Sequence, residues 1–210
     1  MQERQRSEKP VAKTPLGNAV EVPSQYWEDL EQRNMGKVCE NVLAINHPPT
    51  GLILPFLKEY ILVNIQTRCL YRQVQDHWER TDKPLLELLC LVYLLNTGPQ
   101  LLSYKMVSTQ ELKSAHFFKG PHEVETMDLA DAAYKLLAFP KVPLYYLFWK
   151  GDQEFGPGLS VLFDQSVEHH LAADAIWGLV NLVSDVLIMG DSKAWMKQRN
   201  RDGLPDLEKY

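Results

Sequence analysis

The sequence has few cysteines, an excess of acidic over basic residues, and no apolar run long enough to cross a membrane. Its three cysteines, Cys39, Cys69 and Cys90, are odd in number and widely spaced, so they fit neither a disulfide framework nor a CxxC-type metal or cluster site. We expect buried, reduced thiols. The chain carries 22 Lys and Arg against 27 Asp and Glu, a net charge of -5, which argues against a nucleic-acid partner.

Signals for export or membrane insertion are also missing. Residues 1–10 contain no apolar stretch of the kind found in a secretory signal. The longest uncharged stretch, residues 88–104, is interrupted by Asn96-Thr97-Gly98-Pro99, which ends a helix well short of a membrane span. We therefore expect a cytoplasmic protein with no membrane span.

Catalytic signatures are absent as well. No GxSxG, Walker A, GxGxxG or HExxH pattern occurs, so hydrolase, P-loop, dinucleotide-binding and zincin assignments have no support in the sequence. The chain also shows no metal-ligand spacing that would assign a cofactor to it. The function has to be sought in the arrangement of individual polar and apolar residues.

Apolar hairpins alternate with patterned helices, which predicts an α+β fold with an antiparallel or mixed sheet and two main helices packed on it. We expect helices over residues 24–33, 82–95, 127–138 and 172–189. We expect strands over residues 52–57, 60–72, 101–107 and the hairpin 142–163. The main helices are 82–95, apolar almost all round, and the amphipathic 172–189.

The two ends of the chain differ in composition from the part between them. Residues 1–23 are rich in charge and proline, and residues 191–210 are similar. Such segments bury too little apolar surface to order themselves, so we expect flexible tails around a single domain over residues 24–190. The large apolar residues of the second tail are candidate partner contacts: Trp195, Met196 and Tyr210.

The most informative stretch is residues 142–163, an apolar strand, a turn rich in Gly and acidic residues, and a second apolar strand. Both faces of the first strand are apolar, so we expect the hairpin inside a sheet, and we expect Phe148 and Leu91 in the core. Polar residues in its turn and beyond its second strand form a candidate ligand-binding set: Asp152, Glu154, Asp164, Ser166 and His169.

These five residues permit two interpretations. If the turn and the exit of the second strand lie close together, the carboxylates and the imidazole could bind a divalent cation or act as acid and base. The next helix would add its first N–H groups, with Trp149 and Phe155 as apolar walls. The same residues also suffice to build a rigid turn and a helix start. Both interpretations stay open.

A resemblance covers residues 26–188. It is carried by Leu54-Pro55-Phe56-Leu57 with Glu59-Tyr60, residues 85–96, Ser108 with Glu111-Leu112, Pro140-Lys141-Val142-Pro143-Leu144, residues 149–155, residues 163–166 and His169-His170-Leu171. In these blocks the chain resembles an uncharacterised prokaryotic domain family of unknown function, common in anaerobic bacteria and archaea. Some members carry an iron–sulfur domain, which implies anaerobic redox or corrinoid metabolism.

The resemblance implies no catalytic residues. Because this chain lacks a Cys-rich segment, any iron–sulfur cluster or corrinoid would sit on a partner. One hypothesis is therefore a non-catalytic accessory or binding module that associates with a larger enzyme or redox protein. The alternative is a small-ligand- or metal-binding enzyme that uses Asp152, Glu154, Asp164 and His169. Clustering of these four around one pocket would favour the second hypothesis.

Overall fold

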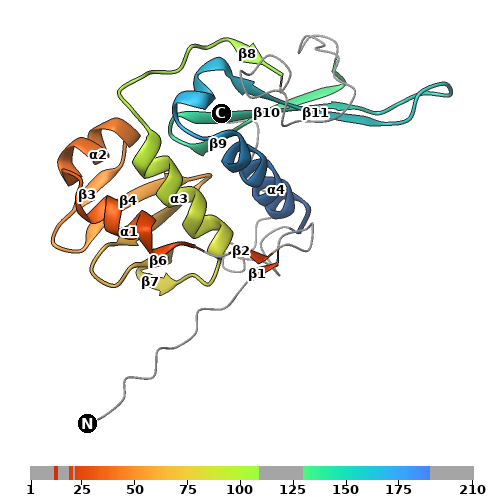
Figure 1. Ribbon diagram of the computed structural model, residues 1–210. Coiled ribbons are helices and arrows are strands. Elements are labelled where there is room, and N and C mark those ends of the chain that lie inside the picture. The colour runs from red at the N-terminus through yellow and green to blue at the C-terminus, as the bar shows by residue number, and fades with distance from the viewer. Residues whose placement is uncertain (1–11, 14–18, 21, 109–129, 190–210) are drawn as a thin grey trace.

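In the described part of the chain, a five-stranded and a four-stranded antiparallel sheet combine with four α-helices and a two-stranded ladder, which confirms the predicted α+β class (Figure 1). The computed structural model describes residues 12–13, 19–20, 22–108 and 130–189. Within the amino-terminal segment, β1 (Ala12–Lys13) and β2 (Ala19–Val20) pair as a small antiparallel ladder. The candidate partner residues Trp195, Met196 and Tyr210 lie outside the described residues.

The first sheet has five strands in sequence order: β3 (Ile45–His47), β4 (Gly51–Phe56), β5 (Glu59–Asn64), β6 (Cys69–Val74) and β7 (His77–Arg80). The single strand predicted over residues 60–72 is wrong, because a turn divides it into β5 and β6. In this turn Arg68 N donates to Ile65 O, and Thr67 N donates to Asn64 Oδ1 at 3.1 Å. The apolar alternation continued through the turn and concealed it.

Three helices lie on one face of this sheet: α1 (Ser24–Glu31), α2 (Met35–Val42) and α3 (Pro84–Asn96) (Figure 1). The central position expected for α3 is confirmed, since most of its side chains are buried. Its Tyr93 ring stacks on Phe139 with centroids 4.4 Å apart, and the Tyr93 hydroxyl accepts a hydrogen bond from Lys141 N. Helix α3 therefore links the two sheets.

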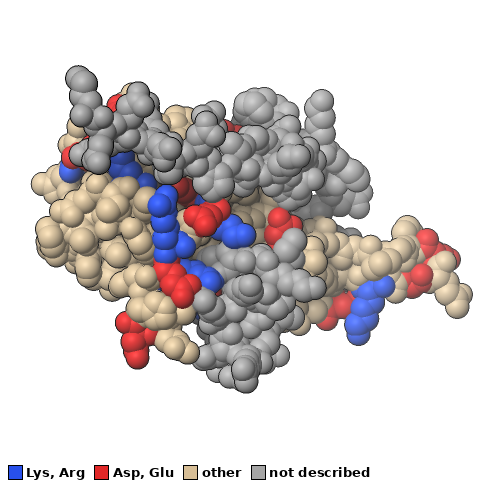
Figure 2. Space-filling view, turned by 90° about the horizontal axis from the view of Figure 1, so that it is seen from below, with Lys and Arg blue, Asp and Glu red and all other residues tan. Residues whose placement is uncertain are grey.

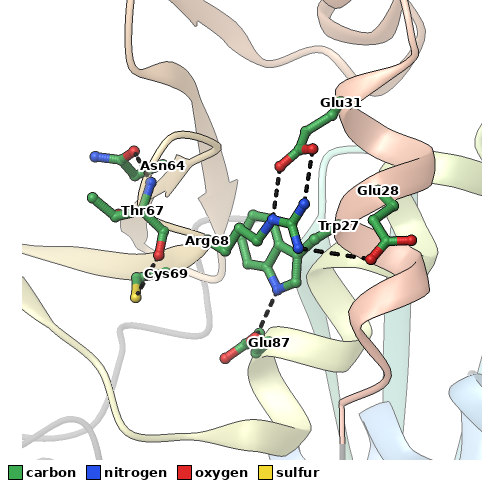
Figure 3. Close-up of polar contacts among 8 residues, drawn as sticks. All are labelled: Trp27, Glu28, Glu31, Asn64, Thr67, Arg68, Cys69 and Glu87. Atoms are coloured by element: carbon green, nitrogen blue, oxygen red, sulfur yellow. Dashed lines mark hydrogen bonds and ion pairs between the residues drawn. The ribbon is translucent and has the colours of Figure 1, made fainter. Parts of the chain in front are cut away.

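Polar contacts hold α1 in place from two sides (Figure 3). The Trp27 indole is buried and donates to Glu87 Oε1 of α3 at 2.8 Å. On the other side, the Arg68 guanidinium makes a bidentate pair with Glu31, at 2.8 and 3.0 Å, and lies 3.8 Å from Glu28. The turn between β5 and β6 is therefore fastened to α1 through Arg68.

The second sheet has the order β8-β11-β10-β9. Its strands are β8 (Met106–Val107), β9 (Ala132–Phe139), β10 (Val142–Trp149) and β11 (Gly158–Asp164), and α4 (Ala173–Met189) packs on it. The central place of the 142–163 hairpin is confirmed. From α4, Ser184 Oγ lies 3.2 Å from Tyr146 Oη of β10. Leu85 of α3 lies 3.4 Å from a Cβ built on Gly178, so the two main helices are in close contact.

Two expected elements differ in the structure. The helix predicted over residues 127–138 is wrong, because residues 132–139 form β9. The Ala-rich run favours a helix locally, but pairing with β10 from Val142 to Phe148 outweighs that preference. The strand predicted over residues 101–107 is reduced to the two residues of β8. Ser108 and Glu111 also have the spacing of a helix N-cap, which predicts a helical turn from Ser108 to Leu112, and residues 109–112 lie outside the described residues.

One cluster of buried apolar side chains draws on both sheets and on all four helices. Leu91 is fully buried in it, as expected, and Cys39, Cys69 and Cys90 are free and buried. The expectation for Phe148 is wrong, because this side chain is 37 % exposed.

Among the described residues, no helix has both the length and the apolar character needed to cross a membrane. The β10–β11 hairpin extends beyond the helices as an arm (Figure 1).

Candidate functional site

The register of β10 and β11 separates the five predicted site residues into two groups. Trp149 pairs with Gly158 next to the turn, whereas Leu144 pairs with Phe163 near the opposite end. At about 3.4 Å per residue, the turn and Asp164 are about 20 Å apart. The expected convergence is wrong, because the exit of a hairpin's second strand lies at the end opposite its turn. Asp164, Ser166 and His169 belong to the base of the arm, and Asp152 and Glu154 to its tip.

At the base of the arm, the Asp164 carboxylate is buried and organises the backbone around it. Its Oδ1 accepts hydrogen bonds from Ser166 N, Ser166 Oγ, Ser103 N and Ser103 Oγ, at 2.6 to 2.9 Å. Its Oδ2 accepts from Tyr104 N at 2.7 Å. Both oxygens are therefore occupied by donors of the chain itself, which is the pattern of a structural carboxylate.

Electrostatics at the base agree with this role. Burial alone would raise the pKa of Asp164, but the hydrogen bonds from Ser166 and Ser103 outweigh it and hold the pKa below its ordinary value. The carboxylate caps the 3₁₀ turn Gln165–His169 and ties it to the segment leading into β8. Asp164 thus joins two segments about sixty residues apart.

The histidine pair is split between surface and interior. The predicted ligand His169 is exposed, whereas His170 is fully buried, and in the described part of the chain neither of its ring nitrogens has a hydrogen-bond partner. Burial, together with the positive charge of Lys141, lowers the pKa of His170 to about 4, so the imidazole is neutral at pH 7. Lys141 is buried too, and its Nζ donates to Gly98 O at 3.0 Å.

At the tip, the second aspartate builds a local turn. Asp152 Oδ1 accepts from Glu154 N at 2.8 Å and from Phe155 N at 2.7 Å, and Asp152 N donates to Phe155 O at 2.8 Å. The two hydrogen bonds to its side chain lower the pKa of Asp152, so the carboxylate is charged at neutral pH. Gly151 has φ +78°, and a Cβ there would lie 2.7 Å from Phe155 O, so the turn requires glycine.

This turn displays apolar side chains next to carboxylates. Phe155 is 72 % exposed, and Leu159, Phe148, Asp152 and Glu154 are also exposed. Figure 2 shows acidic side chains in red at the far end of the arm. Lys150 N donates to Asp131 Oδ2 at 2.8 Å, which fastens the start of the turn to the segment preceding β9. The tip is therefore an ordered, exposed surface of mixed apolar and acidic character.

The part of the chain that the structure describes contains no set of side chains placed to bind a metal ion. Among those residues, no group of three or more His, Cys, Asp or Glu side chains is placed to hold an ion. Cys90 is buried beside Glu87, and burial followed by that negative charge raises the pKa of its thiol. Burial also raises the pKa of Cys39. Both thiols are therefore protonated and unreactive at neutral pH.

The sequence analysis named Lys141 and His170 only in the blocks that carry the resemblance and did not predict that both are buried, and it treated Phe155 only as the wall of a pocket. One signal could have identified His170: Val167, His170 and Leu171 follow helical spacing, and all three are buried. No local pattern marks Lys141, because its burial depends on the end of α3, far away in the sequence.

Comparisons with known proteins assign a family description to the part of the chain that contains the arm. A family model described as a domain of unknown function (DUF3786) matches residues 121–186, which include β9, β10, β11 and most of α4. No curated protein and no solved structure matches the chain. Both ends of the arm thus lie within the segment that is similar to this uncharacterised domain.

Proposed function

We propose that this protein is a cytoplasmic, non-catalytic binding module that docks on a larger protein through the tip of the β10–β11 arm. The observation that carries the proposal is the ordered tip, where an exposed aromatic side chain stands beside two carboxylates. The resemblance stated above supplies the setting: the partner is a larger enzyme or redox protein of anaerobic metabolism, and any iron–sulfur cluster or corrinoid belongs to that partner.

The order of the tip supports binding because it lowers the entropic cost of association. Three hydrogen bonds join Asp152 to Glu154 and Phe155, so the turn does not have to be ordered by a partner. Rigid presentation of an aromatic anchor is a common way to gain affinity. Most of the Phe155 side chain is exposed to solvent, so its full burial would be gained only in a complex.

The charge of the tip specifies the partner's surface. Phe155 and Leu159 would fit an apolar pocket on the partner, and Asp152 and Glu154 would pair with basic side chains at the rim of that pocket. A surface of this kind discriminates against acidic partners by like-charge repulsion. The geometry offers less to the alternative, an enzyme or small-ligand binder that uses Asp152, Glu154, Asp164 and His169, because the arm holds these residues at opposite ends.

Site-specific photo-crosslinking in the native host tests the proposal. A benzoylphenylalanine replaces Phe155 at the tip or, as a matched control, Leu101 near the base, which is 75 % exposed. We expect the probe at residue 155 to capture one protein that the probe at residue 101 does not, and we expect capture to be lost when Asp152→Lys and Glu154→Lys are added. Equal capture from both positions, or no capture from residue 155, would refute docking through the tip.

A further inference from the structure

The five-stranded sheet has an apolar face turned away from α1, α2 and α3, here called the outer face. The ladder register places Ile45, Ile53, Leu62, Tyr71 and Arg80 in one row across all five strands. A second row contains Pro55, Tyr60, Gln73 and Trp78, each two residues from a member of the first row and so on the same face.

These side chains are not part of the main core. The core cluster takes the alternate residues of the same strands, such as Leu52, Leu54 and Val63, whereas none of the outer-face residues belongs to it. Tyr60 is 45 % exposed and Ile45 is 56 % exposed, Ile53, Tyr71 and Trp78 are half-buried, and Leu62 is buried. An antiparallel sheet with one face on a core ordinarily turns polar residues to water on the other. Here apolar side chains occupy most of the first two rows, while His47, Asn64, Gln73 and Arg80 lie toward the margins, and such an apolar patch indicates an interaction surface.

We infer that the outer face binds the outer face of a second copy of this chain. The charge distribution identifies the occupant. The protein has a net charge of -5, so most of its surface repels a second copy. By contrast, no strand residue of the outer face is Asp or Glu, and its only guanidinium, Arg80, lies on the end strand β7. Two outer faces can therefore meet without bringing carboxylates together.

The strand edges favour a face-to-face arrangement over pairing of edges. Strand β3 has only three residues, and β7 has four, with a His77–Glu79 pair and the exposed Arg80. Short and charged edges resist extension of the sheet by another chain. Two outer faces related by a two-fold axis would instead pack as a sandwich with the sheets about 10 Å apart. Leu62 and Tyr71 would lie near the centre of that interface.

Sedimentation velocity on the purified full chain tests the inference. We expect the intact protein to sediment at about 50 µM as a dimer of twice its 24.2 kDa. The double substitution Ile45→Lys/Tyr60→Lys should yield a monomer, because four buried charges would face an apolar surface in the dimer. The matched control Trp177→Lys/Ile188→Lys introduces the same charges at exposed apolar residues of α4 and should stay dimeric.

Circular dichroism shows whether both double variants keep the fold. Should Ile45→Lys/Tyr60→Lys fail to fold, Tyr60→Ser removes only apolar surface, and we expect it to weaken dimerisation at least tenfold. A monomeric intact protein at about 50 µM would overturn the inference. So would a dimer that dissociates with the Trp177→Lys/Ile188→Lys pair but survives the outer-face substitutions. The inference does not rest on the proposed role of the arm.

Discussion

The base and the tip of the β10–β11 arm contain the same local device with opposite consequences. At each end an aspartate accepts a hydrogen bond from the backbone N–H two residues later, Ser166 at the base and Glu154 at the tip. Asp164 is buried and also binds Ser103 and Tyr104 from a distant segment, whereas Asp152 is exposed and binds only its own turn. The long-range partners therefore decide that one aspartate holds the fold and the other shapes a surface.

The largest effect is expected from the base. Asp164→Ala leaves five donors of Ser103, Tyr104 and Ser166 without their acceptor, and the two donors of Ser166 are buried. Loss of a buried, hydrogen-bonded charge costs about 4 kcal/mol of unfolding free energy. Urea denaturation measures it, with Asp152→Ala as the control, which should change the midpoint far less. Equal losses at the two aspartates would break the comparison.

Side chains toward the tip of the arm should contribute less to stability than side chains of the core. Leu91→Ala, in the core on α3, should cost about 3 kcal/mol because it leaves a cavity in a fully buried position. Phe148→Ala, further out on β10, should cost less than Leu91→Ala, since its side chain is partly exposed and contacts Tyr134 and Tyr146. Thermal melts of both variants decide the order. A greater loss for Phe148→Ala would contradict the gradient.

Acid should weaken the base through His170. Its pKa is about 4 in the folded protein against 6.5 in the unfolded chain, so the unfolded state binds the extra proton first. Stability is therefore complete above pH 6.5 and falls as the pH drops toward 4, by about 2 kcal/mol between pH 7.5 and pH 5. The lowered pKa of Asp164 adds a separate loss only below its ordinary value of 3.8.

Urea midpoints measured across this pH range test the assignment to His170. We expect His170→Leu to flatten the profile between pH 6.5 and pH 5, because the buried imidazole is the group whose proton uptake changes on unfolding there. The exposed neighbour His169→Leu serves as the control and should leave the slope as it is. A slope that persists in His170→Leu and vanishes in His169→Leu would contradict the account.

The smallest effect on stability, and a clear effect on order, is expected at the tip. Asp152→Ala removes the acceptor of Glu154 N and Phe155 N, so these two amides should exchange with solvent at least tenfold faster. The unfolding midpoint should hardly move, because the turn is exposed. Hydrogen exchange followed by NMR measures both amides, with Glu154→Ala as a control that keeps the acceptor. Unchanged exchange in Asp152→Ala would show that other contacts order the tip.

The sequence predicted the positions of helices and strands better than it predicted which residues they bring together. Apolar patterning located α3, α4 and the hairpin because each pattern is local, and β9 escaped because its Ala-rich run resembles a helix until β10 pairs with it. The five candidate site residues were identified as polar clusters around a hairpin, but their separation follows from antiparallel register, which a linear sequence does not display. Phe155 stood beside the predicted acidic pair, and only its exposure in the structure shows it to be a surface group.

The most direct test of the account is Phe155→Ala, measured for binding and for stability in parallel. Calorimetric titration uses the purified protein that crosslinks to residue 155, and a thermal melt follows the variant alone. Truncation of an anchoring aromatic at an interface costs at least about 2 kcal/mol, so we expect affinity to fall about 30-fold or more while the melting temperature stays unchanged. Unchanged affinity, or a melting temperature that falls as far as it does for Leu91→Ala, would contradict the division between a structural base and a binding tip.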